Sequence, residues 1–451
     1  MSPAPALPER GPYALRARVI TPLTVGGTRD EPDGIVEVDA NGRITFVGAA
    51  PARAEAPEAA PTAIDLRPWV VLPGMVDLHA HLPQVPNAGV GYSLDLLTWL
   101  DRLTFPTERA WADPGVAERL APAIFEAFAA AGTTTVLGYG VVYEAAMDAA
   151  FRAAEANGIR AILGKVMMDR VTYDPTIEPS TILDRSVRET AGLIERWHGA
   201  DDGRLGYAVT PRFAVSCTPE MLRESASLAR STGTWWQSHV SEDPGEIEEV
   251  RRLFPGAIDY VDVYDRAGAL GERTILAHAI HLSERELARL VECGVRVAHC
   301  PSSNLFIGAG VMPLARWQAA GLTVGLGSDV SGGPELSLLA VARVGAYAQM
   351  ARRALVGDEG VVLDPLGWLR LATLDAARAL GLDEVTGSLE IGKEADLIAV
   401  DPDFVAPLPG VDTPDEDPAD LVSRLLFRAH PGMVQAAWVR GRRLPTGARP
   451  D

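Results

Sequence analysis

His79 and His81 follow a short apolar run, and their type and spacing give the first indication of chemistry in this chain. Residues at positions i and i+2 of a strand point to the same side. Two imidazoles at a strand end can therefore hold one cation, and imidazole is a common metal ligand because it can be neutral near pH 7. A His-x-His pair alone is weak evidence, but further candidate ligands recur downstream.

Polar side chains also stand at the ends of several later apolar segments. Five of the eight histidines stand at such ends, and the four later positions are His239, His278, His299 and Asp329. Three imidazoles and one carboxylate suit a divalent cation, with Zn2+ as the first choice and Fe2+ as the second. Water at an open coordination position would have its pKa lowered towards 7 and would supply hydroxide.

Such a hydroxide needs an electrophile and a group that carries protons. Glu242 stands three residues after His239, where it can take protons to a substrate nitrogen and then to the leaving group. Asp329 can bind the metal and accept the proton of the water, and His278 can orient the hydroxide or stabilise charge on the adduct. A structural role is the alternative for each residue, and for His299 the structural role is favoured.

The elements that position these residues read as strands alternating with amphipathic helices. Alternating β and α units predict a parallel sheet, and eight of them predict a closed (β/α)8 barrel, with catalytic groups at the C-terminal strand ends. The predicted strands are Met75–His79, Thr134–Tyr139, Arg160–Val166, Leu205–Thr210, Thr234–His239, Thr274–His278, Arg296–His299 and Thr323–Ser328.

Both ends of the chain predict a second, smaller β-domain. Short strands occupy the first part, with a hairpin signal, DANG, at residues 39–42. Strand-like segments return at 394–400 and 434–440. Because chain termini often lie close together, we expect residues 1–69 and 388–451 to form one β-sandwich around the barrel of residues 70–387.

Composition narrows the class of protein. The chain has 451 residues, 47% of them hydrophobic, and a net charge of −19, which disfavours nucleic acid and anionic membrane surfaces as partners. Three unpaired-looking cysteines fit a reducing cytosol. No leader-like start or apolar run of about 18 residues is evident. We therefore expect a cytoplasmic protein with a small-molecule substrate.

Several sequence motifs of the chain resemble those of a known superfamily. The chain resembles the metal-dependent amidohydrolase superfamily and, within it, the guanine deaminases. The general motifs are PGMVDLHAH at 73–81, HCPSSN at 299–304 and TGSLEIGKEADLIAVD at 386–401. The more specific motifs are HLPQ at 81–84, LDLLTWLDRLTFPTE at 94–108, TPRFAVSC at 210–217, QSHVSE at 237–242 and GLGSDVSGG at 325–333.

The resemblance implies hydrolysis of guanine to xanthine and ammonia by a zinc enzyme, which we expect to be a homodimer. By position, it implies metal ligands at His79, His81, His239 and Asp329, a proton shuttle at Glu242 and a catalytic histidine at His278. It also implies purine-binding residues at Gln84, Arg212 and Phe213. These side chains suit the task, because an amide and a guanidinium can read the hydrogen-bonding edge of a purine.

Two alternatives stay open at the level of function. A related aminohydrolase could act on another ring, such as 8-oxoguanine, a pterin, cytosine or an s-triazine. A non-catalytic relative could keep the barrel as a binding or scaffold protein, although it would have no need for Glu242. Lys165 ends the third predicted strand, not the fourth, so we expect it to be structural and not a carbamylated bridge between two metals.

Overall fold

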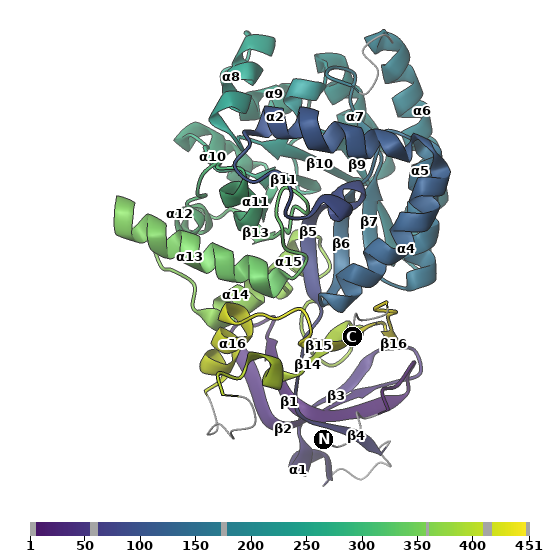
Figure 1. Ribbon diagram of the computed structural model, residues 1–451, viewed down its shortest axis with the longest axis vertical. Coiled ribbons are helices and arrows are strands. Elements are labelled where there is room, and N and C mark those ends of the chain that lie inside the picture. Colours follow the sequence, from purple (N-terminus) through teal and green to yellow (C-terminus); the bar gives the residue numbers. More distant parts are fainter. Residues whose placement is uncertain (1–5, 55–61, 173–177, 358–359, 409–416, 448–451) are drawn as a thin grey trace.

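The computed structural model describes residues 6–54, 62–172, 178–357, 360–408 and 417–447. A barrel of strands and helices lies at one end of the molecule, and a sheet that contains both terminal parts of the chain lies at the other (Figure 1). The predicted α/β barrel with a second domain built from both termini is confirmed.

Among the described residues the barrel has eight strands, and a parallel ladder joins each strand to the next from the first to the last. A further short strand, β8 (Val166–Met167), pairs with β9 outside this ring. In ring order the strands are β5 (Met75–His81), β6 (Thr133–Tyr139), β7 (Arg160–Gly164), β9 (Leu205–Pro211), β10 (Trp235–Val240), β11 (Thr274–His278), β12 (Arg296–His299) and β13 (Thr323–Leu326).

Hydrogen bonds between β5 and the segment after β13 complete the ring. The backbone N–H of His81 donates to the carbonyl of Val330 at 3.0 Å. The backbone N–H of Ser328 donates to Oδ1 of the buried Asp77 at 2.9 Å. The barrel is therefore tied together at the same end of β5 that carries the two histidines.

One predicted strand is interrupted in the structure. The sequence of residues 160–166 reads as a single strand, but β7 ends at Gly164 and β8 begins at Val166. The backbone N–H of Lys165 donates to the hydroxyl of Tyr207 at 3.1 Å, so it leaves the ladder between the strands. A side chain from the neighbouring strand thus breaks the strand.

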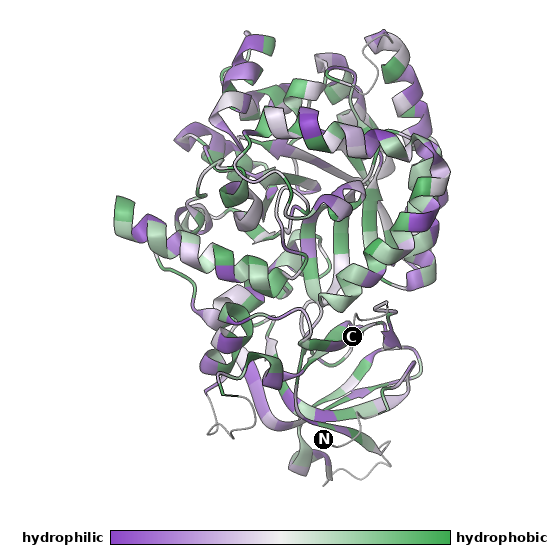
Figure 2. Cartoon of the chain, in the orientation of Figure 1, coloured by the Kyte–Doolittle hydropathy of each residue, from purple (hydrophilic) through white to green (hydrophobic). Residues whose placement is uncertain are grey.

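Helices surround the barrel, and apolar residues concentrate on its strands and on the helix faces that meet them (Figure 2). No helix among the described residues is both long and apolar enough to cross a bilayer. The helices after the barrel's first strand are α2 (Leu96–Trp99), α3 (Phe105–Arg109), α4 (Pro114–Ala130), α5 (Glu144–Asn157), α6 (Pro179–Trp197), α7 (Pro219–Thr232), α8 (Pro244–Leu253), α9 (Tyr260–Arg266), α10 (Glu284–Glu292), α11 (Pro301–Phe306), α12 (Leu314–Ala319), α13 (Leu338–Val356), α14 (Pro365–Leu371) and α15 (Leu374–Ala379).

The terminal parts of the chain share one seven-stranded sheet with the order β16-β15-β14-β4-β1-β2-β3. Strands β4 and β14 join the two parts, with Leu72 opposite Ile398 in an antiparallel ladder. Two helices, α1 (Ala50–Ala54) and α16 (Pro418–Phe427), belong to these parts. The strands are β1 (Tyr13–Pro22), β2 (Thr28–Val38), β3 (Ile44–Ala49), β4 (Ala63–Pro73), β14 (Leu397–Val400), β15 (Val434–Val439) and β16 (Arg442–Arg443).

A buried charge cluster links this sheet to the barrel. Arg160, at the start of β7, is 2% exposed and donates to Glu394 and Asp396 next to β14. Arg440 also donates to Glu394, at 2.8 Å. A buried guanidinium needs such partners because an unpaired charge in the interior is costly.

Candidate active site

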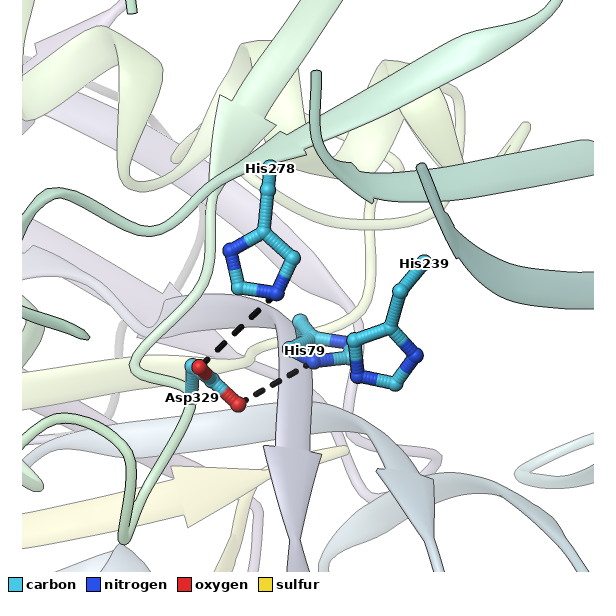
Figure 3. Close-up of side chains that lie close together, drawn as sticks. All are labelled: His79, His239, His278 and Asp329. Atoms are coloured by element: carbon cyan, nitrogen blue, oxygen red, sulfur yellow. Dashed lines mark ion pairs between the residues drawn. The ribbon is translucent and has the colours of Figure 1, made fainter. Parts of the chain in front are cut away.

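The predicted polar residues meet at the C-terminal ends of the barrel strands. One ligand atom from each of His79, His239, His278 and Asp329 lies within 4.8 Å of the others, and all four side chains are buried. Figure 3 shows the Asp329 carboxylate between His278 and His79, with dashed lines to both, and the His239 ring next to His79. His81 joins them, because its Nε2 atom lies 3.3 Å from Oδ1 of Asp329.

Two hydrogen bonds orient the imidazoles towards this centre. Nδ1 of His239 donates to the carbonyl of Arg212 at 2.7 Å, and Nδ1 of His278 donates to Oδ1 of Asn304 at 2.9 Å. Because both acceptors are oxygens without a proton, Nδ1 of each ring carries the hydrogen and Nε2 keeps its lone pair. Such outer hydrogen bonds are usual around metal-binding histidines.

The donor set fits a divalent cation. Nε2 of His79 and Nε2 of His278 make no hydrogen bond within the described residues, although Oδ1 of Asp329 lies 3.1 Å from the former. A buried, unpaired nitrogen costs free energy. A cation shared by the nitrogens and the carboxylate would remove that cost, and three nitrogens with one oxygen suit zinc or a similar ion.

The backbone at two of these positions is unusual. His278 has a φ of 73° and Asp329 a φ of 48°, so both residues adopt the left-handed conformation without being glycine. Such backbone costs about 1–3 kcal/mol and persists where surrounding structure imposes it. Here it turns the two side chains from their strand ends towards one point.

Burial keeps the imidazoles neutral. It lowers the pKa of His79, His81 and His239 below the usual value, and it lowers the pKa of His278 to about 4. Burial opposes the charge of Asp329, but the adjacent imidazoles, His79 first, hold its pKa well below its usual value. Neutral nitrogens beside a carboxylate are the forms that bind a metal.

Glu242 lies beside this centre. It is 3% exposed, and its Oε2 atom is 3.4 Å from Nε2 of His278. Burial, and then the charge of Asp329, raise the pKa of Glu242 well above its usual value. A carboxyl group with a raised pKa can both accept and return a proton near neutral pH.

A cavity opens directly over these groups. The polar residues that line it include His81, Arg212, Glu242 and Asp329. The aromatic ring of Phe213 also lines the cavity. The apolar side is formed by Leu96, Trp99, Leu100 and Ile307, mainly from α2 and the π-helical segment that follows it, η2 (Leu100–Thr104). A flat, partly polar ring would meet an apolar face and hydrogen-bonding groups at the same time.

Comparison with known proteins agrees with this geometry. Residues 70–444 match the model of the Amidohydrolase family. A probable guanine deaminase of Deinococcus radiodurans is 40% identical over 415 residues, which is 91% of this chain and 92% of the relative.

The chain belongs to the amidohydrolase family.

Two solved structures of guanine deaminases are also similar to this amidohydrolase. The structure from E. coli has a TM-score of 0.87 and 31% identity, and the match covers 96% of this chain and 99% of that chain. The structure from C. acetobutylicum, described with guanine bound in the active site, has a TM-score of 0.86 and 27% identity, with the same coverage.

Two of the three predicted substrate residues line the cavity of this amidohydrolase, and the third does not. Arg212 and Phe213 line the cavity. Gln84 is 1% exposed, is not among the lining residues and donates from Nε2 to Oε1 of Glu108 at 2.7 Å. Glu108 also accepts from Arg212, and sequence reasoning did not single it out, although it ends the motif at 94–108.

Three other residues considered in the sequence analysis are not part of the proposed metal site. Nζ of Lys165 lies 3.2 Å from Glu189 and donates to Ser186 at 3.1 Å. His281 donates from Nε2 to the carbonyl of Ala309 at 2.8 Å. His299 is buried, and neither of its ring nitrogens has a hydrogen-bond partner within the described residues.

Proposed function

We propose that this protein is a zinc-dependent guanine deaminase that hydrolyses guanine to xanthine and ammonia. The observation that carries the proposal is one cavity bounded by a buried histidine–aspartate cluster, Glu242, Arg212 and Phe213. The names of the similar proteins support the same substrate. The cluster supports a divalent metal, and the donor chemistry favours zinc over Fe2+.

The proposed ligands are His79, His81, His239 and Asp329, for one ion per chain. A divalent ion held there supplies Lewis acidity, which lowers the pKa of a bound water towards 7. His278 has its Nε2 atom 3.9 Å from Oδ2 of Asp329 and 3.4 Å from Glu242. We assign it the task of stabilising the charge that develops as water adds to the ring carbon.

Glu242 and Asp329 move the protons. The oxygen of water forms a bond to the carbon that bears the exocyclic amine, while Glu242 takes a proton of that water and passes it to the adjacent ring nitrogen. Asp329 accepts the second proton. Asp329 passes this proton to Glu242, which has already given its first proton to the ring nitrogen, and Glu242 delivers it to the amine. The carbon–nitrogen bond breaks, ammonia leaves, and the carbonyl of xanthine forms.

The remaining residues bind and orient the purine. Phe213 offers an aromatic face at the cavity wall, and Arg212 offers guanidinium donors. Gln84 is joined to Arg212 through Glu108, which accepts a hydrogen bond from each. A site whose buried polar groups pair with the ring rejects rings that lack those partners, by factors of up to about 10⁴–10⁵.

Ammonia release from metal-loaded protein tests this proposal across guanine, 8-oxoguanine, adenine, cytosine and pterins. We expect guanine to have the highest kcat/KM. A higher kcat/KM for another ring would assign the enzyme to that substrate, and no release from any ring would favour a binding or scaffold role. Metal analysis should give one ion per chain.

We also propose that the protein works in the cytoplasm as a homodimer. Its cysteines are unpaired, with Cys217 and Cys300 buried, which fits a reducing compartment. On α13, Tyr347, Met350 and Leu355 are 58%, 53% and 86% exposed, and exposed apolar side chains in one region suit self-association. Light scattering of the purified protein measures the assembly mass.

A further inference from the structure

Glu108 joins Gln84 to Arg212, and no part of the proposed reaction explains this contact. Glu108 lies on α3 and is 0% exposed. Its Oε1 atom accepts a hydrogen bond from Nε2 of Gln84 at 2.7 Å, and its Oε2 atom accepts one from the guanidinium of Arg212 at 2.6 Å. One buried carboxylate thus holds both side chains that we assign to reading the purine.

The hydrogen-bond chemistry fixes the orientation of Gln84. An ionised carboxylate only accepts hydrogen bonds, whereas a glutamine amide has one end that donates and one that accepts. The amide nitrogen of Gln84 must therefore face Glu108. Its oxygen, Oε1, is buried and has no partner within the described residues. This oxygen is left free to accept from an N–H group.

The same helix also fixes Arg212. The guanidinium lies over the ring of Phe105, 5.4 Å from its centroid, while the carboxylate of Glu108 holds one of its nitrogens. Phe105 and Glu108 stand three residues apart, on one side of α3. Charge-assisted hydrogen bonds of this kind are short and directional. Arg212 therefore meets the cavity in one defined orientation.

We propose that Glu108 is a positioning residue that sets substrate specificity by fixing Gln84 as an acceptor and Arg212 as a donor. The inference rests on the proposed function, because it assumes that these two side chains read the ring. It adds that the preferred ring must offer an N–H donor to Gln84 and a carbonyl oxygen or ring nitrogen to Arg212. Loss of the carboxylate would free the amide to turn.

Glu108→Gln tests the proposal in zinc-loaded, full-length protein. The replacement keeps the shape of the side chain but removes its charge and its purely accepting character. We expect KM for guanine to rise more than kcat falls, and kcat/KM to drop roughly ten- to hundredfold. Metal content should stay at the wild-type value, because neither Gln84 nor Arg212, the two side chains that Glu108 holds, is a proposed ligand.

Glu394→Gln is the matched control. Glu394 is also a buried carboxylate held by arginines, but it lies at the junction of the barrel and the terminal sheet. We expect this variant to lower the melting temperature while leaving KM for guanine unchanged. A purely structural role for Glu108 would make the two variants alike in stability and in KM, and would overturn the proposal.

A double-mutant cycle with Gln84→Ala shows whether Glu108 acts through Gln84. We expect the loss in kcat/KM for the double variant to be smaller than the product of the two single losses. Losses that multiply fully, or a Glu108→Gln variant within twofold of wild type, would overturn the inference. If Glu108→Gln does not fold, Glu108→Asp, which keeps the charge on a shorter arm, takes its place with the same expectations.

Calorimetric binding of guanine and xanthine separates the two proposals. If wild type releases no ammonia from guanine, the proposed function fails. In that case, binding at least tenfold tighter to wild type than to Glu108→Gln still supports the positioning role. Equal binding by the two proteins overturns it.

Discussion

The backbone N–H of Asp329 donates a 2.7 Å hydrogen bond to the carbonyl oxygen of His79. This bond joins the end of the first barrel strand to the segment after the last one, and both residues belong to the proposed metal site. Ring closure and metal binding therefore depend on the same few residues. Loss of a ligand should affect the stability of the fold as well as the metal content.

The first prediction concerns His79. We expect His79→Ala to lose most of its bound metal and to melt several degrees lower, because a metal that binds only the folded state stabilises it. Metal analysis and thermal unfolding measure the two effects. His281→Ala, close to the same strand ends but hydrogen-bonded to Ala309, should keep its metal. Full metal content in His79→Ala would remove that residue from the ligand set.

The second prediction concerns the proton carrier. Glu242→Gln should retain the metal and lose turnover by about 10² or more, the usual effect of removing a proton-transfer group. Glu248→Gln, at an exposed position on the next helix, should behave as wild type. Steady-state ammonia release with parallel metal analysis provides the measurement. A near-normal rate in Glu242→Gln would show that another group transfers the proton.

The third prediction uses His299 and pH. Burial lowers the pKa of His299 from its ordinary 6.5 to about 3, so the unfolded chain binds one more proton than the folded chain between these values. His299 therefore makes stability fall as the pH drops below 6.5, by up to ~1.4 kcal/mol per pH unit.

Urea unfolding of chelator-treated protein between pH 5 and 6 tests this dependence. His299→Leu should flatten the fall in unfolding free energy by about one proton's contribution. His430→Gln removes an imidazole from an exposed position and serves as the control. An unchanged slope in His299→Leu would mean that the buried imidazole does not resist protonation.

The fourth prediction concerns the junction of the two domains. Arg160→Met should lower the free energy of unfolding by about 3–5 kcal/mol, because it leaves Glu394 and Asp396 buried without that partner. Arg223→Met breaks an exposed pair with Glu220 and should cost only ~0–1 kcal/mol. Chemical denaturation of both variants gives the comparison, and equal costs would contradict the assignment.

Much of this architecture could be predicted from the sequence, because the patterns that indicate it lie within short segments or recur along the chain. Alternating apolar strands and amphipathic helices indicated the barrel. The rule that parallel strands bring their carboxyl ends to one face then predicted that His79, His81, His239, His278 and Asp329 lie together. The pairing of the terminal strands also followed from two strand-rich ends around one barrel.

The parts that could not be predicted depend on contacts between residues far apart in the chain. Glu108 is 24 positions from Gln84 and 104 from Arg212, and nothing in its own neighbourhood marks it as their shared acceptor. The break between β7 and β8 depends on a hydroxyl from Tyr207, 42 residues away. Local patterns describe periodicity, whereas these features arise only after the strands are in register.

The pairing of β4 with β14 has a consequence for synthesis on the ribosome. Strand β4 is made early, but its neighbour β14 is made near the end, so the small sheet stays incomplete while most of the barrel emerges. An unpaired strand edge favours association with other chains. A nascent chain that stalls before Leu397 would expose that edge, and emergence of β14 is what allows it to be covered.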